Sequence, residues 1–167
     1  MDIFHEQIVK IRKTPIKYFE IIGLWLLALI VTVVAFLFLS SFGLLIGFGA
    51  FYGAYYLSGK LSIEYEYIVT NSVMDIDRII AKRSRKRELS FSLESVDSVE
   101  KYNPLAKKSG FNKTVFACDA DDKNAYAVTI TAEGKGRTLL VLSPNDDIKE
   151  SMKKCMPKFV SNSAFKE

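Results

Sequence analysis

The chain has 167 residues, of which 25% are charged and 49% are hydrophobic, and its formal net charge is +4. Its one histidine, His5, lies in the amino-terminal segment, which excludes a multi-histidine metal site or a histidine-dependent catalytic triad assembled within one chain. The two cysteines, Cys118 and Cys155, lie far apart in the sequence and are expected to be reduced thiols.

The segment between Glu20 and Lys60 contains no charged residue. As one helix it would reach about 58 Å, nearly twice the ~30 Å thickness of a bilayer core. The polar break at 40–43 therefore divides it into two predicted transmembrane helices, Pro15–Leu39 and Phe42–Ser58, in a hairpin at 15–59. A cleaved signal peptide and a soluble hydrophobic hairpin are the alternatives, but the segment is too long for the first and has no polar face for the second.

Lysines and arginines flank both outer ends of this hairpin, whereas its central turn has no charge. The positive-inside rule then predicts an integral protein of the cell membrane with two spans and both termini in the cytoplasm. Residues 1–14 are predicted to be a juxtamembrane amphipathic segment in which 2–13 form an interfacial helix, with a frayed tail as the alternative. Three tyrosines fit an aromatic belt at the same interface: Tyr52, Tyr55 and Tyr56.

Small residues line the second predicted helix in two sets. The first set shares one helical face and predicts close packing against the first helix. The second set forms a neighbouring small-xxx-small pair, which suits either the same hairpin or a dimer or partner subunit. The sets are Gly43, Gly47, Ala50 and Ala54, and Gly49 with Gly53.

From Leu61 onward the hydrophobic pattern alternates, which is typical of half-buried strands. Turn residues and alternation together predict seven short strands within a domain at 61–157. The first is expected before the Asn71–Ser72 turn, and the others at Val73–Ala81, Glu88–Leu93, Val96–Tyr102, Thr114–Cys118, Ala125–Ala132 and Arg137–Leu142.

A helix is predicted after the last strand. Ser143 suits its N-cap, Pro144 suits its first position, and Pro157 ends it. The residues at 158–167 are predicted to be a tail. Because a small sheet of seven strands tends to close, the fold class expected is an α+β membrane protein: a transmembrane helical hairpin followed by a seven-stranded, partly open β-barrel plugged by the carboxy-terminal helix.

The strand sequences resemble those of a bacterial family of small two-helix membrane proteins with a PH-like (pleckstrin-homology-like) cytoplasmic domain. The resemblance is carried by Tyr65–Asn71, Ile76, Ile79–Arg83, Leu89–Phe91 and Val96–Val99. It implies a PH-like fold and a membrane location, and it implies no catalytic activity.

Charges in the predicted loops alternate along the chain. If the strands follow simple up-and-down connections, the basic loops lie at the membrane end of the domain and the acidic loops at the far end. A lysine or arginine near an anionic leaflet contributes about 1 kcal/mol, so these loops form a hypothetical lipid clamp. A solvated hairpin tip that only sets the topology is the alternative. The predicted lipid-binding residues are Lys82, Arg83, Arg85, Lys86, Arg87, Lys107 and Lys108.

The sequence shows no catalytic motif and no metal-ligand spacing, and we expect no catalytic residue, no metal site and no cofactor. The predicted function is that of a non-enzymatic integral membrane protein that displays a PH-like interaction domain at the cytoplasmic membrane face, as a scaffold or accessory subunit. The alternative is an anionic-lipid surface sensor that uses the basic loops. Expected partners are anionic membrane lipids and either a protein partner or a second copy of the chain, and no nucleic acid.

Overall fold

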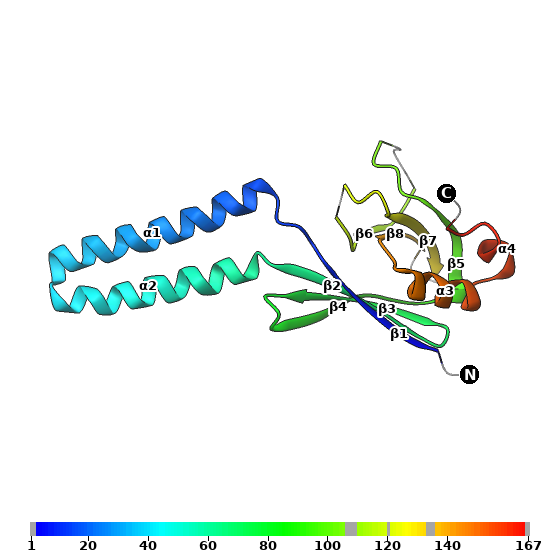
Figure 1. The fold of residues 1–167 in the computed structure, drawn as a ribbon, viewed down its shortest axis with the longest axis horizontal. Helices are drawn as coiled ribbons and strands as arrows, with labels where there is room; N and C mark the ends of the chain where they lie inside the picture. Colours follow the sequence, from blue (N-terminus) through cyan, green and yellow to red (C-terminus); the bar gives the residue numbers. More distant parts are fainter. Residues whose placement is uncertain (1–2, 106–109, 120, 133–135, 166–167) are drawn as a thin grey trace. The chain divides into compact units, whose positions relative to one another are not determined.

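A computed structural model describes residues 3–105, 110–119, 121–132 and 136–165 (Figure 1). The chain divides into two compact units. We call Arg12–Ile63 with Ile80–Ser84 the helical unit. The remainder, Met1–Ile11, Glu64–Ile79 and Arg85–Glu167, is called the sheet unit.

The helical unit consists of two long helices that run antiparallel, α1 at Pro15–Leu39 and α2 at Ser41–Lys60 (Figure 1). Ser40 joins them with a positive φ of 49°, and the rings of Trp25 and Phe51 meet across the pair with centroids 5.9 Å apart. Both predicted helices are therefore present, and α2 ends at Lys60 instead of Ser58.

Large apolar side chains cover the outside of both helices. Phe38, Phe42 and Phe48 are 85%, 80% and 78% exposed. In the part of the chain that the structure describes, α1 is the helix whose length and composition suit a membrane crossing, with a mean hydropathy of 2.9 over 18 residues. Neither helix has the polar face that a soluble helix needs.

Sheet A contains four antiparallel strands in chain order, and the first of them precedes the helices. β1 pairs with β2 so that Lys10 lies opposite Glu64. The interfacial helix predicted for 2–13 is wrong, because Phe4–Lys10 form a strand in which Val9 packs against the core while Phe4 and Ile8 are exposed. The strands are β1 at Phe4–Lys10, β2 at Ile63–Thr70, β3 at Val73–Ile80 and β4 at Ser84–Ser92.

Sheet B is ordered β5-β7-β8-β6, and β6 lies parallel to β8. Since β5 and β8 both run antiparallel to β7, β5 and β6 run in the same direction. Its elements are β5 at Val96–Lys101, β6 at Lys113–Phe116, β7 at Tyr126–Ala132 and β8 at Gly136–Leu142, preceded by the 3-10 turn η1 at Leu93–Ser95.

This topology overturns the up-and-down connections assumed for the loop charges. Lys101 ends β5 opposite Tyr126, whereas Lys113 begins β6 opposite Thr138 at the other end of β7 and β8. Lys101 and Lys113 therefore lie at opposite ends of sheet B. The separation of basic loops from acidic loops therefore fails for sheet B.

The strand count also differs from the prediction. The described residues contain all seven predicted strands and β1 in addition, arranged as two four-stranded sheets and not as a closed barrel. β4 begins at Ser84, so much of the basic run that was predicted to be a turn is part of a strand. The α+β class remains correct.

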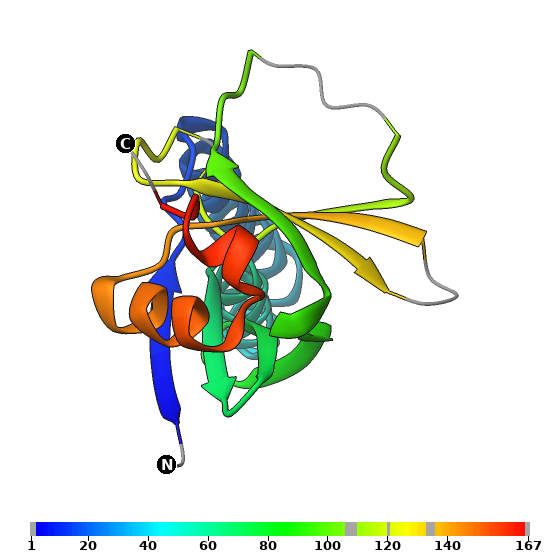
Figure 2. The same cartoon turned by 90° about the vertical axis from the view of Figure 1, so that its right-hand side faces the viewer.

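Two helices complete the sheet unit, α3 at Asp146–Cys155 and α4 at Lys158–Ser161 (Figure 2). The cap is Asn145 and not the predicted Ser143, because the side-chain Oδ1 of Asn145 accepts a hydrogen bond from the Ile148 backbone amide at 2.9 Å. The tail predicted at 158–167 is also wrong as far as residue 165, because α4 begins this segment and its side chains pack on the core. Val160 and Ala164 are each 2% exposed, and the Phe165 ring contacts Tyr126.

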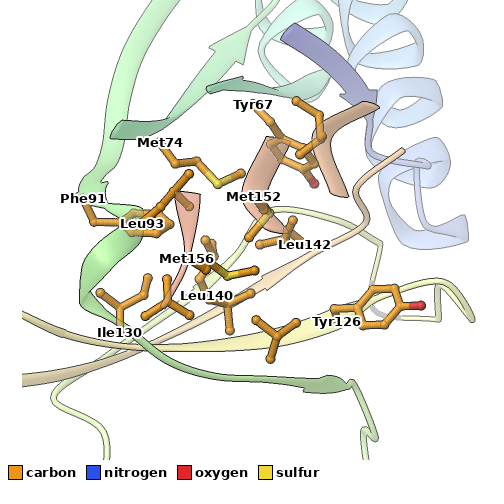
Figure 3. Close-up of a cluster of buried hydrophobic side chains, with 14 of the residues drawn as sticks. Tyr67, Met74, Phe91, Leu93, Tyr126, Ile130, Leu140, Leu142, Met152 and Met156 are labelled. Atoms are coloured by element: carbon orange, nitrogen blue, oxygen red, sulfur yellow. The ribbon is translucent and has the colours of Figure 1, made fainter. Parts of the chain in front are cut away.

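The core lies between the two sheets and α3 (Figure 3). Met74, Leu140 and Met152 are fully buried in it and come from sheet A, sheet B and α3. The Tyr67 hydroxyl donates a 2.6 Å hydrogen bond to the Ala117 carbonyl and accepts one from the Ser143 amide. Burial is the main cause that raises the pKa of Tyr67. The phenol therefore stays protonated and joins the sheets.

Candidate functional site

The turn between β3 and β4 is fastened to the end of α2. Ala81 and Lys82 both have positive φ, 56° and 55°, and the Arg83 amide bonds to the Ile80 carbonyl, which is a tight two-residue hairpin loop. The Ala81 amide also donates a 2.9 Å hydrogen bond to the Ser62 carbonyl. The turn therefore lies beside the end of the helical hairpin.

Two cations at this end are held over tyrosine rings. Arg83 Nη2 donates a hydrogen bond to the Tyr55 hydroxyl at 3.1 Å, and its guanidinium carbon lies 5.5 Å from the ring centroid. Lys60 Nζ lies 4.6 Å from the Tyr56 centroid. Such cation–π contacts orient a charged group while leaving it at the surface. Tyr55 and Tyr56, predicted as part of an aromatic belt, therefore also position basic residues.

Two small cavities border Arg83. We call the larger, of about 220 Å³, the Arg83 pocket. The smaller has a volume of about 130 Å³. Arg83 lines both, and among the residues that the structure describes no acidic residue lines either. The Arg83 pocket is formed by Lys13, Ile21, Tyr55, Ser58, Gly59, Ser62, Ala81 and Arg83, and the smaller cavity by Tyr56, Lys60, Ile80, Ala81, Arg83 and Ser84.

The five predicted lipid-binding residues that the structure describes divide between the turn and β4. Lys82 and Arg83 lie in the turn, while Arg85, Lys86 and Arg87 lie in β4 and are exposed. The two remaining residues, Lys107 and Lys108, lie outside the described residues. The helical unit thus keeps two of the predicted cations and adds Lys13 and Lys60, which the sequence reasoning used only for topology.

Arg85 and Arg87 are engaged in ion pairs with carboxylates of sheet A. Arg85 Nη2 lies 2.7 Å from Glu66 Oε2. Arg87 contacts both Asp75 and Asp77 at 2.9 Å, and the hydrogen bond to Asp77 is the main cause that raises its pKa. Glu66 and Asp77 are each only 4% exposed. A buried carboxylate requires a partner of opposite charge. The charges of Arg85 and Arg87 are therefore used to neutralise carboxylates of sheet A.

Sequence reasoning missed these partners, although a signal is present. The pairs Glu64-x-Glu66 and Asp75-x-Asp77 each place two acids on one face of a strand, opposite the core residues Tyr67 and Ile76. Arg85-x-Arg87 has the same spacing on β4. Acidic residues at alternate positions of one strand and basic residues at alternate positions of a neighbouring strand predict ion pairs between the strands.

The small residues of α2 separate into an inner and an outer set. A Cβ atom on Gly43 would lie 2.4 Å from the Ala35 backbone, and one on Gly47 would lie 2.5 Å from the Thr32 side chain. Ala54 is buried and Ala50 is half-buried, whereas a Cβ on Gly49 or Gly53 meets nothing within 4 Å. Gly49 and Gly53 therefore do not serve the contact between α1 and α2.

A groove of about 770 Å³ lies in the sheet unit beside β4, one of the two edge strands of sheet A. Six consecutive β4 residues, 87–92, line it, and residues of β6, β7 and β8 form other parts of its wall. Lys113 Nζ reaches across from β6 and donates a 3.0 Å hydrogen bond to the Glu88 carbonyl. An edge strand beside an open groove is a place where another chain can pair.

Reactive side chains are scarce in this structure. Cys118 and Cys155 are free thiols, and burial is the main cause that raises the pKa of Cys118 to about 12. Neither is therefore an activated thiolate at neutral pH. Among the residues described, no group of three or more His, Cys, Asp and Glu side chains is arranged to hold a metal ion.

A model of a protein family described as bacterial PH-like domain (DUF6106) matches residues 1–162. The chain belongs to this bacterial PH-like family. The match includes β1, both long helices and the two sheets, so the resemblance in the strand sequences is confirmed at the level of the family. PH-like membership supports a role as an interaction domain. No curated protein and no solved structure matches the chain.

Proposed function

We propose that this protein is a non-enzymatic integral membrane protein whose PH-like domain is an interaction module at the cytoplasmic membrane face, acting as a scaffold or accessory subunit. The observation that carries the proposal is the placement of α1 and α2 in the chain between two paired strands of the domain, β1 and β2. Both helices are apolar on their exposed surfaces. The anchor is thus part of the domain's connectivity and not an appended tail.

Two spans are favoured over one by strand pairing. Lys10 and Glu64 are opposite each other in sheet A, so the chain that leaves β1 must return to the same place to begin β2. A hairpin of two crossings satisfies this requirement. α2 has 20 residues, which rise about 30 Å, the thickness of a bilayer core. The basic residues at the outer ends of the hairpin, including Lys13 before α1 and Lys60 at the end of α2, favour the cytoplasm for both termini.

Topology is tested by labelling single cysteines in intact cells, in a background that lacks Cys118 and Cys155. A membrane-impermeant maleimide should reach Phe42→Cys, in the turn of the hairpin, from outside. Lys86→Cys, in β4, should react only after the membrane is opened. Labelling of both variants from outside, or of neither, contradicts two spans with a cytoplasmic domain.

The groove beside β4 supports the interaction role, because it runs along the edge of a strand at the end of sheet A. Its volume of about 770 Å³ is within the range of about 300–1,000 Å³ that binding pockets occupy. A photo-crosslinking residue at Ser90, which lines the groove, should yield one defined protein adduct in native membranes. Phe159 is 71% exposed on α4 and outside the groove lining, so the same probe there is the matched control. Equal adducts at both positions contradict a partner bound in the groove.

Outward-facing glycines offer a second surface, within the membrane. Gly49 and Gly53 have open space beside them, and small residues allow close approach of another helix. We propose that a partner helix or a second copy of the chain packs there. Gly53→Leu should weaken such an assembly, measured by single-molecule subunit counting in bilayers, while leaving the α1–α2 hairpin intact. An unchanged subunit count and partner content removes this surface from the proposal.

A second candidate function is an anionic-lipid surface sensor. It is favoured by the cations that the helical unit holds beside Tyr55 and Tyr56. A sensor role predicts that full-length protein in bilayers responds to the fraction of anionic lipid and that the response weakens as salt rises. A response that is independent of salt and lipid charge excludes this candidate.

A further inference from the structure

We propose that the Arg83 pocket binds the phosphate of an anionic phospholipid headgroup. The inference rests on the proposed insertion of α1 and α2 into a bilayer and gives the sensor candidate a defined binding site. It commits to a lipid ligand and to two charged residues, Lys13 and Arg83, of which Lys13 was not among the predicted lipid-binding residues.

The pocket has the chemistry that a phosphate requires. Lys13 and Arg83 supply positive charge, and no carboxylate of the described part of the chain lines the cavity. Tyr55 accepts its hydrogen bond from Arg83, which leaves its own O–H free to donate to a phosphate oxygen. Ser62 adds a second hydroxyl to the wall, whereas the Ser58 hydroxyl already donates to the Tyr55 carbonyl.

The arginine is positioned before any ligand arrives. Its turn is held to the end of α2 by the hydrogen bond between the Ala81 amide and the Ser62 carbonyl. Its guanidinium is held by the Tyr55 hydroxyl and ring. A guanidinium that is already held in place loses less conformational freedom on binding than a freely moving lysine side chain. Arg83 should therefore contribute more to phosphate affinity than such a lysine.

Location distinguishes a lipid from a soluble phosphate. Ile21, in the charge-free part of α1, lines the same cavity as the two cations. The cavity of about 220 Å³ is smaller than the pockets of about 300–1,000 Å³ that enclose small molecules, so it suits only the phosphate end of a larger ligand. The apolar outer surfaces of α1 and α2 are available to the acyl chains.

The native Trp25 provides the measurement. It is the only tryptophan of the chain, and it lies one helical turn beyond Ile21 on the same face of α1. Full-length protein is placed in phosphatidylcholine bilayers containing a small fraction of phosphatidylglycerol, with bromine on the acyl chains of one lipid or the other. The ratio of the two quenching efficiencies, corrected for lipid fraction, is the selectivity for the anionic lipid.

We expect a wild-type selectivity of about five or more, and a loss of about fivefold in Arg83→Gln and in Lys13→Gln, the effect of one cation near a lipid phosphate. Lys82→Gln is the matched control, because it removes the same charge from the same turn but lines neither cavity. Lys13→Gln leaves the contact between Arg83 and Tyr55 in place, so it tests the pocket without disturbing the turn.

Three results overturn the site. Equal losses in all three variants indicate diffuse surface charge, and no loss in any variant shows that the pocket is not used. A selectivity abolished by inorganic phosphate, but not by chloride at the same ionic strength, assigns the pocket to free phosphate. Absence of quenching by either brominated lipid has a different meaning: it contradicts membrane insertion, and thereby the proposed function on which the site depends.

Discussion

Lys10 and Glu64 are cross-strand partners although the entire helical hairpin lies between them in the sequence. The two strands that they belong to, β1 and β2, would form an ordinary β-hairpin if α1 and α2 were a short loop. The PH-like domain is therefore assembled from chain segments on both sides of the helical hairpin. Any experiment on a fragment that begins after α2 removes an edge strand of sheet A.

The first prediction is that the sheet unit folds without the helices when β1 is retained. Replacing 12–62 by Asn-Gly leaves Ile11 and Ile63 joined by a two-residue hairpin loop. The chain keeps the contacts of Gln7, whose side chain donates to the Ser143 carbonyl and accepts from the Asn145 amide. We expect a soluble, cooperatively unfolding protein.

The control is a chain that starts at Leu61 and lacks β1. It loses the β1–β2 ladder and the Gln7 hydrogen bonds, each worth about 1 kcal/mol. Urea unfolding followed by circular dichroism compares the two. Equal stability of both chains contradicts a structural role for β1.

A second prediction concerns packing of α1 against α2. Gly43→Leu and Gly47→Leu place side chains into the Ala35 backbone and the Thr32 side chain, so the helices must separate. We expect destabilisation by about 1–3 kcal/mol, the range for overpacking. Gly49→Leu is the matched control because its Cβ meets open space. Protease resistance of the hairpin in detergent should fall in the first two variants and stay unchanged in the control.

A third prediction concerns the arginines of β4, whose ion pairs stabilise the sheet unit, in contrast to Arg83 in the turn. Arg85→Ala leaves Glu66 buried without its ion-pair partner and should destabilise the sheet unit. We expect about 1–3 kcal/mol, less than for a fully buried pair, because the Arg85 side chain is 56% exposed and solvent screens the interaction. Lys86→Ala, one residue away on the same strand, is the control. Equal thermal stability of the two variants contradicts the assigned ion pair.

Much of the fold follows from local patterns in the sequence. The uncharged segment predicts both long helices, and alternation predicts the seven strands after them. The N-terminal strand was missed because Phe4, Ile8 and Ile11 happen to repeat at helical spacing. Its strand conformation depends on pairing with β2, which is distant in sequence, and local periodicity does not report such a partner.

The candidate site was predicted only in part, because local sequence patterns do not report where the turn ends or what its residues contact. The basic run was visible in the sequence, but only the structure shows where the tight turn ends. With Ala81 and Lys82 as the two loop residues, Arg83 faces α2, whereas Arg85 enters β4 and meets Glu66. A difference of two residues thus separates a cation available to a ligand from one that neutralises a buried carboxylate.

The last prediction concerns alkaline pH and Cys118. Burial, followed by the nearby charges of Asp122 and Asp119, raises the pKa of this thiol from 9.0 to about 12. Between these values the unfolded chain has lost the thiol proton while the folded chain keeps it. The unfolded state therefore binds fewer protons, and stability falls as pH rises above about 9. Cys118→Ala should reduce this fall.

Urea midpoints of the sheet unit with its Asn-Gly connection, measured at pH 8 and pH 10, test the prediction. The midpoint should drop more for the wild-type sequence than for Cys118→Ala. Cys155→Ala is the matched control, since the pKa of Cys155 is also raised by burial, but its side chain is only half-buried and its thiol should be modified faster by a maleimide. A Cys118 thiol that reacts as fast as Cys155 at pH 8 contradicts its burial between sheet B and the side chains of Tyr102 and Phe111.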